Sequence, residues 1–243
     1  MPHGGPDWST GGQISTVHTI EDLGELAARL GSIVTFDRRG NVIAYDDFES
    51  GLSKWYRWGD TGYEITWNSE FARSGGFCCK VQTGAVTNYT AGLTRAMGYP
   101  ALSPIGIEFS FARHQNLKYI ELIVRVRSLD KMVAWSLRYD HANSKFQYLF
   151  GGRYNDVPDL VFAAIPKFYG SVCFHTVKLV IDPVNQKYKR LIIDNQMADL
   201  SNYSIDLGAG GTPYLETQIC MITSADEAGI IYFDNVIWTQ NEP

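Results

Sequence analysis

The sequence predicts an all-β protein built as an antiparallel β-sandwich. From residue 46 onward, short segments alternate apolar and polar residues, the period of strands with one buried and one exposed face. Turns rich in Gly, Pro and Asn recur about every 8 to 12 residues, as in a sandwich. Of the 243 residues, 45% are hydrophobic, 13% aromatic and 19% charged, so the chain can fill a sizeable core.

The first 45 residues are predicted to form an extension made of an arm, a helix and a hairpin. Residues 1–18 contain four Gly and two Pro and show no periodicity, which is typical of an arm. Thr19 is placed as the N-cap of a short amphipathic helix that stops at Gly31. Residues 32–36 and 41–45 flank a Gly-containing turn, the pattern of a β-hairpin.

Residues 46–243 are predicted to form one sandwich domain, with residues 1–45 as an assembly extension. In the strand expected around Phe109, the residues Ile107 and Phe111 point the same way and alternate with polar neighbours. The expected strands are Tyr63–Asn68, Gly76–Thr83, Thr87–Met97, Ile105–Arg113, Lys118–Arg127, Lys131–Tyr139, Lys145–Phe150, Val172–Asp182, Tyr188–Asp194, Tyr214–Ile222 and Gly229–Trp238.

Charge and hydropathy exclude several classes of partner. The net charge of -5 provides no basic surface for phosphate backbones, so no nucleic-acid partner is expected. Apolar runs such as residues 161–165 are far shorter than the roughly 18 residues of a membrane-spanning helix, so no membrane insertion is expected. The polar, turn-rich start lacks the apolar region of a signal peptide. We therefore expect a place in a virion or other extracellular assembly reached without a signal peptide, or otherwise in the cytoplasm.

The four cysteines do not form a recognisable metal or redox motif. Cys78, Cys79, Cys173 and Cys220 include no Cys-x-x-Cys pair. Adjacent Cys78 and Cys79 fall in a predicted strand and should point to opposite faces. Ordinary buried, reduced thiols are the expected state.

Three segments at the two ends of the predicted sandwich resemble jelly-roll carbohydrate-binding modules: Asp46–Gly51, Ala72–Gly76 and Ile231–Ile237. Residues 174–182 and 188–194 are similar to strands of concanavalin-like lectin and glucanase sandwiches. The resemblance implies that the sandwich has a jelly-roll arrangement.

The same resemblance implies a structural calcium ion between the first and last strands. Its oxygen ligands would be Asp47 or Glu49, a backbone carbonyl near Gly75, and Asp234, in keeping with the preference of Ca²⁺ for carboxylate and carbonyl oxygens. The alternative is that Asp47 caps a turn and that Asp234 accepts backbone N–H groups without a metal.

Three aromatic residues cluster in a predicted loop after the acidic segment: Trp55, Tyr56 and Trp58. A flat aromatic face can stack on a sugar ring, so this cluster is a candidate carbohydrate-binding platform. Aromatic rings of this kind are equally typical of ordinary cores and of protein interfaces, and these two alternatives stay open.

No catalytic motif is recognisable, and an enzyme is not expected. The sequence lacks a Gly-x-Ser-x-Gly elbow, a His-Glu-x-x-His helix, a phosphate-binding loop and the acidic glucanase motif. His114, His141 and His175 are isolated in the sequence. A pair of carboxylates brought together across strands would escape this reasoning, because glycosidases need acids about 5 to 9.5 Å apart in space.

These features lead to two functional hypotheses. The main one is a non-catalytic structural subunit whose jelly-roll body and N-terminal arm contact neighbours, as in virion capsid or decoration proteins and extracellular fibres. Its partners would be copies of itself, in a homo-oligomer, or other structural subunits. The alternative is a carbohydrate-binding module or lectin with a structural calcium site and a glycan as its partner.

Overall fold

The computed structural model describes residues 39–98, 103–129, 131–158, 160, 173–205, 207–209 and 212–243. These residues belong to one compact unit, Asp37–Pro243. The predicted arm, the predicted helix and the first strand of the predicted hairpin lie outside the described residues.

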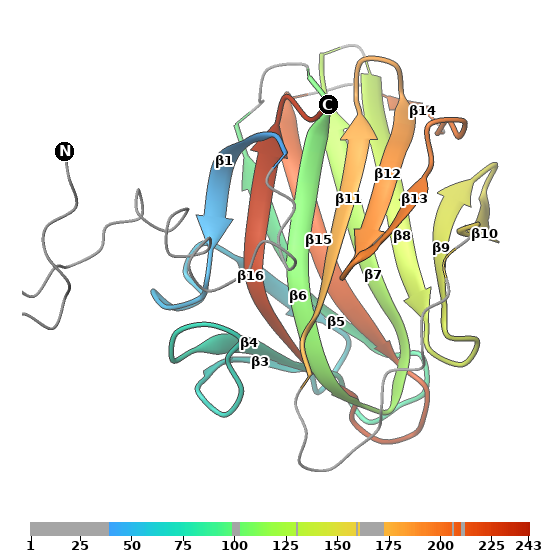
Figure 1. Cartoon of the computed structure of the whole chain (residues 1–243). Helices are drawn as coiled ribbons and strands as arrows, with labels where there is room; N and C mark the ends of the chain where they lie inside the picture. Colours follow the sequence, from blue (N-terminus) through green and yellow to red (C-terminus); the bar gives the residue numbers. More distant parts are fainter. Residues whose placement is uncertain are drawn as a thin grey trace, which may run out of the picture. The chain divides into compact units, whose positions relative to one another are not determined.

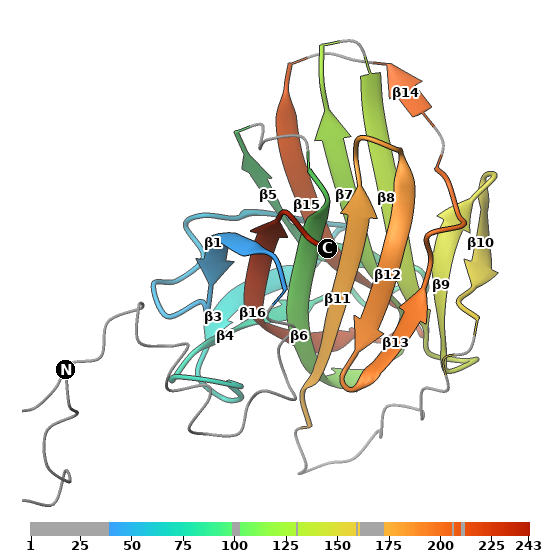
Figure 2. The ribbon, with the colours of Figure 1, turned by 45° about the horizontal axis from the view of Figure 1, so that its top comes forward.

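The described strands form two antiparallel sheets that pack face to face as a jelly-roll sandwich (Figures 1 and 2). Sheet A has the order β13 (Gln196–Asp199), β12 (Lys187–Ile193), β11 (His175–Asp182), β6 (Ile105–Gln115), β16 (Ile230–Gln240), β4 (Cys78–Gln82) and β3 (Glu64–Asn68), with β1 (Asn41–Asp46) also paired to β16. Sheet B has the order β10 (Arg153–Asp156), β9 (Lys145–Phe150), β8 (Lys131–Asp140), β7 (Leu117–Arg127), β15 (Tyr214–Thr223), β5 (Thr90–Met97) and β2 (Tyr56–Gly59), with β14 (Leu207–Ala209) also paired to β8.

The alternation in the sequence sets which face of each strand is buried. Along β7, buried residues alternate with partly exposed ones over the whole strand, so its apolar residues Ile120, Leu122 and Val124 point into the core. The largest side chains of that core include Trp135, Trp238 and other fully buried rings. The prediction of an all-β antiparallel sandwich is confirmed.

The sandwich begins earlier than predicted. The sequence predicts that residues 41–45 form one strand of an N-terminal hairpin, but they belong to β1, which pairs with the last strand, β16, from Asn41 opposite Gln240 to Asp46 opposite Val236. The local alternation correctly predicts a strand here. It does not reveal the partner, because the pairing is between the two ends of the unit.

Short strands were also missed. The sequence predicts a loop for the segment containing Tyr56 and Trp58, but this segment is strand β2 at the edge of sheet B. Strands β10, β13 and β14 also have only three or four residues each. So few residues carry too little alternation to be recognised.

Three of the four cysteines are buried free thiols, as expected: Cys78, Cys79 and Cys220. Cys173 is exposed and departs from that expectation. Burial raises the pKa of the Cys78 thiol to about 12, so this side chain stays protonated at neutral pH. In the described part of the chain, no helix has the length and hydropathy to cross a membrane.

Candidate functional site

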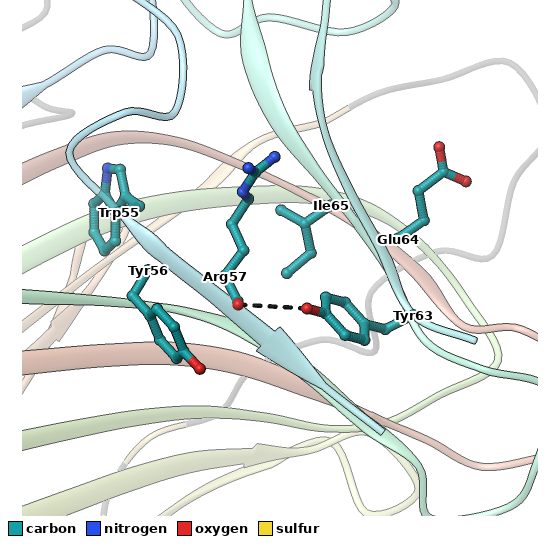
Figure 3. Close-up of a pocket in the computed structure, with 6 residues that line it drawn as sticks. All are labelled: Trp55, Tyr56, Arg57, Tyr63, Glu64 and Ile65. Atoms are coloured by element: carbon teal, nitrogen blue, oxygen red, sulfur yellow. Dashed lines mark hydrogen bonds between the residues drawn. The ribbon is translucent and has the colours of Figure 1, made fainter. Parts of the chain in front are cut away.

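A pocket of about 470 Å³ opens at the edge of the sandwich, where the outermost strands of the two sheets approach each other (Figure 3). Strand β2 ends sheet B and strand β3 ends sheet A. A tight turn joins them, in which the Tyr63 N–H donates to the Asp60 carbonyl at 3.1 Å. The lining residues are Trp55, Tyr56, Arg57, Tyr63, Glu64 and Ile65.

Strand β2 presents two neighbouring side chains on opposite faces. Arg57 pairs with Leu93, a core residue, and its side chain extends on the inner side of the strand (Figure 3). Tyr56 points the other way and is 71% exposed. Trp58 follows on the same face as Tyr56 and is fixed there, because its Nε1–H donates to Thr94 Oγ1 at 2.9 Å.

The turn and strand β3 supply the opposite wall. Tyr63 is 39% exposed, and its hydroxyl donates a long hydrogen bond to the Arg57 carbonyl at 3.4 Å. Its ring packs over Gly59, where an added Cβ would lie 2.6 Å from Tyr63 Cγ. Ile65 is buried and forms an apolar part of the lining. The Tyr63 ring is therefore held in place before any ligand arrives.

Trp55 belongs mainly to the core. It is only 5% exposed, and its Nε1–H donates to Asp46 Oδ2 at 2.9 Å. Its ring lies 5.8 Å from that of Phe48 and 5.7 Å from that of Trp238. Of the three alternatives left open for Trp55, the structure shows a place in the core and not an open stacking face, because aromatic neighbours and a buried carboxylate surround the ring.

The pocket carries a cation that has no ion-pair partner among the described residues. Arg57 makes no salt bridge there, whereas Arg95 nearby lies 3.6 Å from a carboxylate oxygen of Asp46. The Glu64 carboxylate lies on the far side of Ile65 from the Arg57 guanidinium (Figure 3). The lining thus combines tyrosine rings, an aliphatic surface and one available positive charge.

In the predicted calcium site, one carboxylate oxygen of Asp47, one of Glu49 and both of Asp234 accept backbone N–H groups. Glu49 Oε1 accepts the N–H groups of Gly76 and Phe77, both at 2.8 Å. An added Cβ on Gly75 would lie 2.3 Å from the same oxygen. Asp47 Oδ1 accepts the Glu49 N–H at 3.1 Å, which is a turn cap.

Asp234 holds the other side of the same turn. Its Oδ2 accepts the Arg73 N–H at 2.7 Å and the Ser74 N–H at 3.4 Å, and its Oδ1 accepts the Asn235 N–H. Burial raises the pKa of Asp234 to about 6, and these backbone donors only partly offset that effect.

The described residues include no group of three or more His, Cys, Asp or Glu arranged to hold a metal ion. The structure therefore shows the alternative arrangement, in which Asp47 caps a turn and Asp234 accepts backbone N–H groups. The donor set does not fit a calcium ion as arranged, because Glu49 and Asp234 both face N–H groups.

A second polar cluster lies on sheet B, and its side chains hydrogen-bond to and stack on one another. The Arg138 guanidinium lies 4.3 Å from the ring centroid of Tyr119 and 3.8 Å from that of Tyr154, and it donates to Gln147 at 2.7 Å. Burial raises the pKa of Glu121, which accepts from the Tyr154 hydroxyl at 3.3 Å. These contacts join strands β7, β8, β9 and β10.

Of His114, His141 and His175, two can be placed by their side chains. His175 Nδ1 lies 2.8 Å from Asp194 Oδ2 at the end of β11, and His141 lies beside the ring of Tyr139. The side chain of His114 lies outside the described part. Neither of the two lines the pocket.

Sequence reasoning missed four of the six lining residues: Arg57, Tyr63, Glu64 and Ile65. A signal for two of them was present. Tyr63, Ile65 and Trp67 alternate along a predicted strand, so they share one face. The signal for Arg57 was absent, because β2 was not recognised as a strand.

No protein-family model matches this chain, and no curated protein matches it by sequence. Several solved structures share its fold. The cellulose induced protein Cip1 is 13% identical with a TM-score of 0.53, over 81% of this chain and 96% of that one. The endo-β-1,4-glucuronan lyase of the fungus Trichoderma reesei is 12% identical with a TM-score of 0.52, over 82% and 96%. The Emp47p carbohydrate recognition domain is 11% identical with a TM-score of 0.50, over 84% and 99%.

The two sheets and these neighbours define the fold. The chain has a jelly-roll sandwich like those of Cip1, the glucuronan lyase and the Emp47p carbohydrate recognition domain. At identities this low, the likeness is one of fold, and function has to be argued from the pocket.

Proposed function

We propose that this protein binds carbohydrate through the pocket between β2 and β3. The observation that carries the proposal is the exposed ring of Tyr63 beside the apolar Ile65 and the cationic Arg57 in one concave site, with the exposed Tyr56 at the rim on the other face of β2. Tyrosine offers an apolar ring face and a polar hydroxyl on one side chain that loses little conformational freedom. A sugar ring requires the same combination of apolar contact and hydrogen bonds.

The names of the similar structures support this alternative over the structural-subunit hypothesis. They describe a protein induced by cellulose, a lyase acting on a glucuronan, and a carbohydrate recognition domain. No feature of the described residues supports assembly into a virion or a homo-oligomer. We therefore propose carbohydrate binding as the main function.

We further propose that binding occurs without cleavage. The pocket lining contains a single carboxylate, Glu64, whereas glycoside hydrolysis uses two carboxyl groups on either side of the scissile bond. Because one of the similar structures is a lyase, turnover has to be measured directly. We expect no increase in reducing ends and no unsaturated product when the protein is incubated with any glycan that it binds.

A glycan array followed by isothermal titration calorimetry tests the proposal. We expect binding to at least one glycan class, weakened about tenfold in Tyr63→Ala, which corresponds to loss of about 1.4 kcal/mol of stacking and hydrogen bonding. Tyr56→Ala should weaken binding in the same direction.

The matched control is Phe150→Ala. Phe150 is 42% exposed and lies at the end of β9, near the opposite edge of sheet B, so its removal should leave binding unchanged. Absence of binding across the array, or equal binding by Tyr63→Ala and the wild type, would overturn the proposal.

A further inference from the structure

We infer that the ligand is an acidic glycan chain, in which Arg57 binds the carboxylate of a uronic acid residue and Trp67 stacks on another sugar of the same chain. This inference rests on the proposed function and adds two features to it: the charge of the ligand and its length. Each feature is carried by a different side chain.

The charge of the ligand follows from Arg57. In the described part of the chain its guanidinium has no ion pair, and it extends into a pocket lined by tyrosine and isoleucine side chains (Figure 3). Arg57 is exposed, and the hydroxyl groups of a neutral sugar would give it only uncharged hydrogen bonds, which are about half as strong as charge-assisted ones. A carboxylate would instead pair with the guanidinium in a two-pronged, charge-assisted geometry.

The pocket contains no acid close enough to take that role. Glu64 is separated from the guanidinium by Ile65 (Figure 3). The buried Asp46 is already engaged by the Phe48 N–H, the Trp55 indole and Arg95. A ligand carboxylate is therefore the complementary group for Arg57.

The length of the ligand follows from Trp67. This side chain is 47% exposed although Phe77 covers one of its faces, with ring centroids 3.8 Å apart and planes at 19°. Its Nε1–H donates to the Phe48 carbonyl at 2.7 Å. The stacking on Phe77 fixes the plane of the indole, and the hydrogen bond to Phe48 fixes its rotation within that plane. The open face of the indole is therefore held rigidly toward solvent.

Trp67 and the pocket lie on one side of β3. In the register with β4, Ile65 is opposite Val81 and Trp67 is opposite Cys79, and both partners are core residues. Tyr63, Ile65 and Trp67 therefore follow one another along the inner face of the edge strand. At about 3.3 Å per residue, the backbone positions of Tyr63 and Trp67 are about 13 Å apart, which exceeds a single sugar ring and requires a chain.

The test compares two probes that differ only in carrying either a carboxylate or a neutral hydroxymethyl group on each sugar. These are an oligosaccharide of linked glucuronic acid residues and the same oligosaccharide after chemical reduction of its carboxyl groups to alcohols. Both are titrated into the full chain by isothermal titration calorimetry. We expect the acidic probe to bind at least about tenfold more tightly, as for a hydrogen-bonded ion pair, and this preference should decrease as salt is added.

Arg57→Gln should abolish the preference while leaving the weaker binding of the reduced probe in place. Arg57→Lys should retain part of the preference, because it keeps the charge and loses the planar fork. The matched control is Arg153→Gln, at an exposed arginine of β10 on the other edge of sheet B, and it should behave like the wild type.

The length of the site is tested without any mutation by comparing acidic disaccharides with hexasaccharides. We expect the longer chain to bind more tightly in the wild type, and Trp67→Ala to remove that advantage once melting has shown that the variant is folded. If Trp67→Ala does not fold, the affinities of the wild type for the disaccharide and the hexasaccharide decide by themselves whether the site is extended.

The outcomes separate the two proposals. Equal binding of both probes, unaffected by Arg57→Gln, overturns the acidic ligand and leaves carbohydrate binding standing. Equal affinity for short and long chains overturns the extended site. Absence of binding to both probes and to the whole glycan array overturns the proposed function together with this inference.

Discussion

Glu242 is a buried carboxylate held between two cations on the outer side of sheet A. Its Oε1 lies 2.7 Å from Lys178 Nζ, its Oε2 is paired with the Arg190 guanidinium, and Thr239 donates to it as well. Lys178 and Arg190 are also buried. A carboxylate in this position compensates part of the cost of removing two cations from water.

Glu242→Gln should therefore lower the free energy of unfolding by about 3 to 5 kcal/mol, because the variant removes the buried negative charge that Lys178 and Arg190 share. Urea denaturation followed by tryptophan fluorescence measures the change. The control Glu227→Gln removes an exposed carboxylate and should remain within about 0.5 kcal/mol of the wild type. A loss of the same size in both variants would contradict the importance of the Glu242 network.

Asp234 should give the protein a specific pH dependence. Its pKa is raised by burial from 3.8 to about 6, so the folded state binds the proton more tightly than the unfolded state does. The contribution of Asp234 to the free energy of unfolding therefore falls as the pH rises from about 4 to about 6 and is level above that range.

The measurement is the difference in unfolding free energy between Asp234→Asn and the wild type over that pH range. It should shift by roughly 2 to 3 kcal/mol in favour of the variant as the pH rises, since one pKa unit corresponds to about 1.4 kcal/mol. A difference that does not depend on pH would show that the carboxylate titrates normally.

At the scale of elements, Tyr188 connects the two sheets. It is a fully buried residue of β12 in sheet A. Its hydroxyl accepts the Ser136 N–H of β8 at 3.1 Å and donates to the Leu149 carbonyl of β9 at 2.9 Å. Both partners belong to sheet B, so one hydroxyl bridges the sheets through the core.

Tyr188→Phe should cost about 1 to 3 kcal/mol of stability, because it leaves buried backbone groups of sheet B without their partner. Chemical denaturation measures the loss, with Tyr214→Phe as the control at a partly exposed tyrosine. Equal stability of the wild type and Tyr188→Phe would mean that the sheets do not depend on this bridge.

At the scale of the whole molecule, the arrangement of Glu49 and Asp234 predicts that stability is independent of calcium. Both carboxylates accept backbone N–H groups of the turn between Arg73 and Phe77. A ligand that binds only the folded state must raise the melting midpoint. We expect the same midpoint in EGTA and in added Ca²⁺, and a calcium-dependent rise that Glu49→Gln removes would contradict this expectation.

The amino-acid sequence predicts most of the fold, because the alternation that identifies a strand is local. Strands such as β9 and β7 agree with their predicted ranges within about a residue. The pairing of β1 with β16 was not predictable in this way, since it joins opposite ends of the unit. Strand β2 was missed because its four residues are too few to show a recognisable alternation of apolar and polar side chains.

The candidate site was predictable only in part, for the same reason. The sequence by itself determined that aromatic residues cluster around Tyr56 and that acidic residues accompany a Ser-Gly turn. Only the tertiary structure decided that Trp55 turns into the core, that Arg57 and Tyr63 meet across the open edge, and that backbone N–H groups occupy the carboxylates of the turn. The physical reason is that alternation specifies which face of a strand is apolar, whereas the edge where two sheets meet depends on pairings between residues distant in the chain.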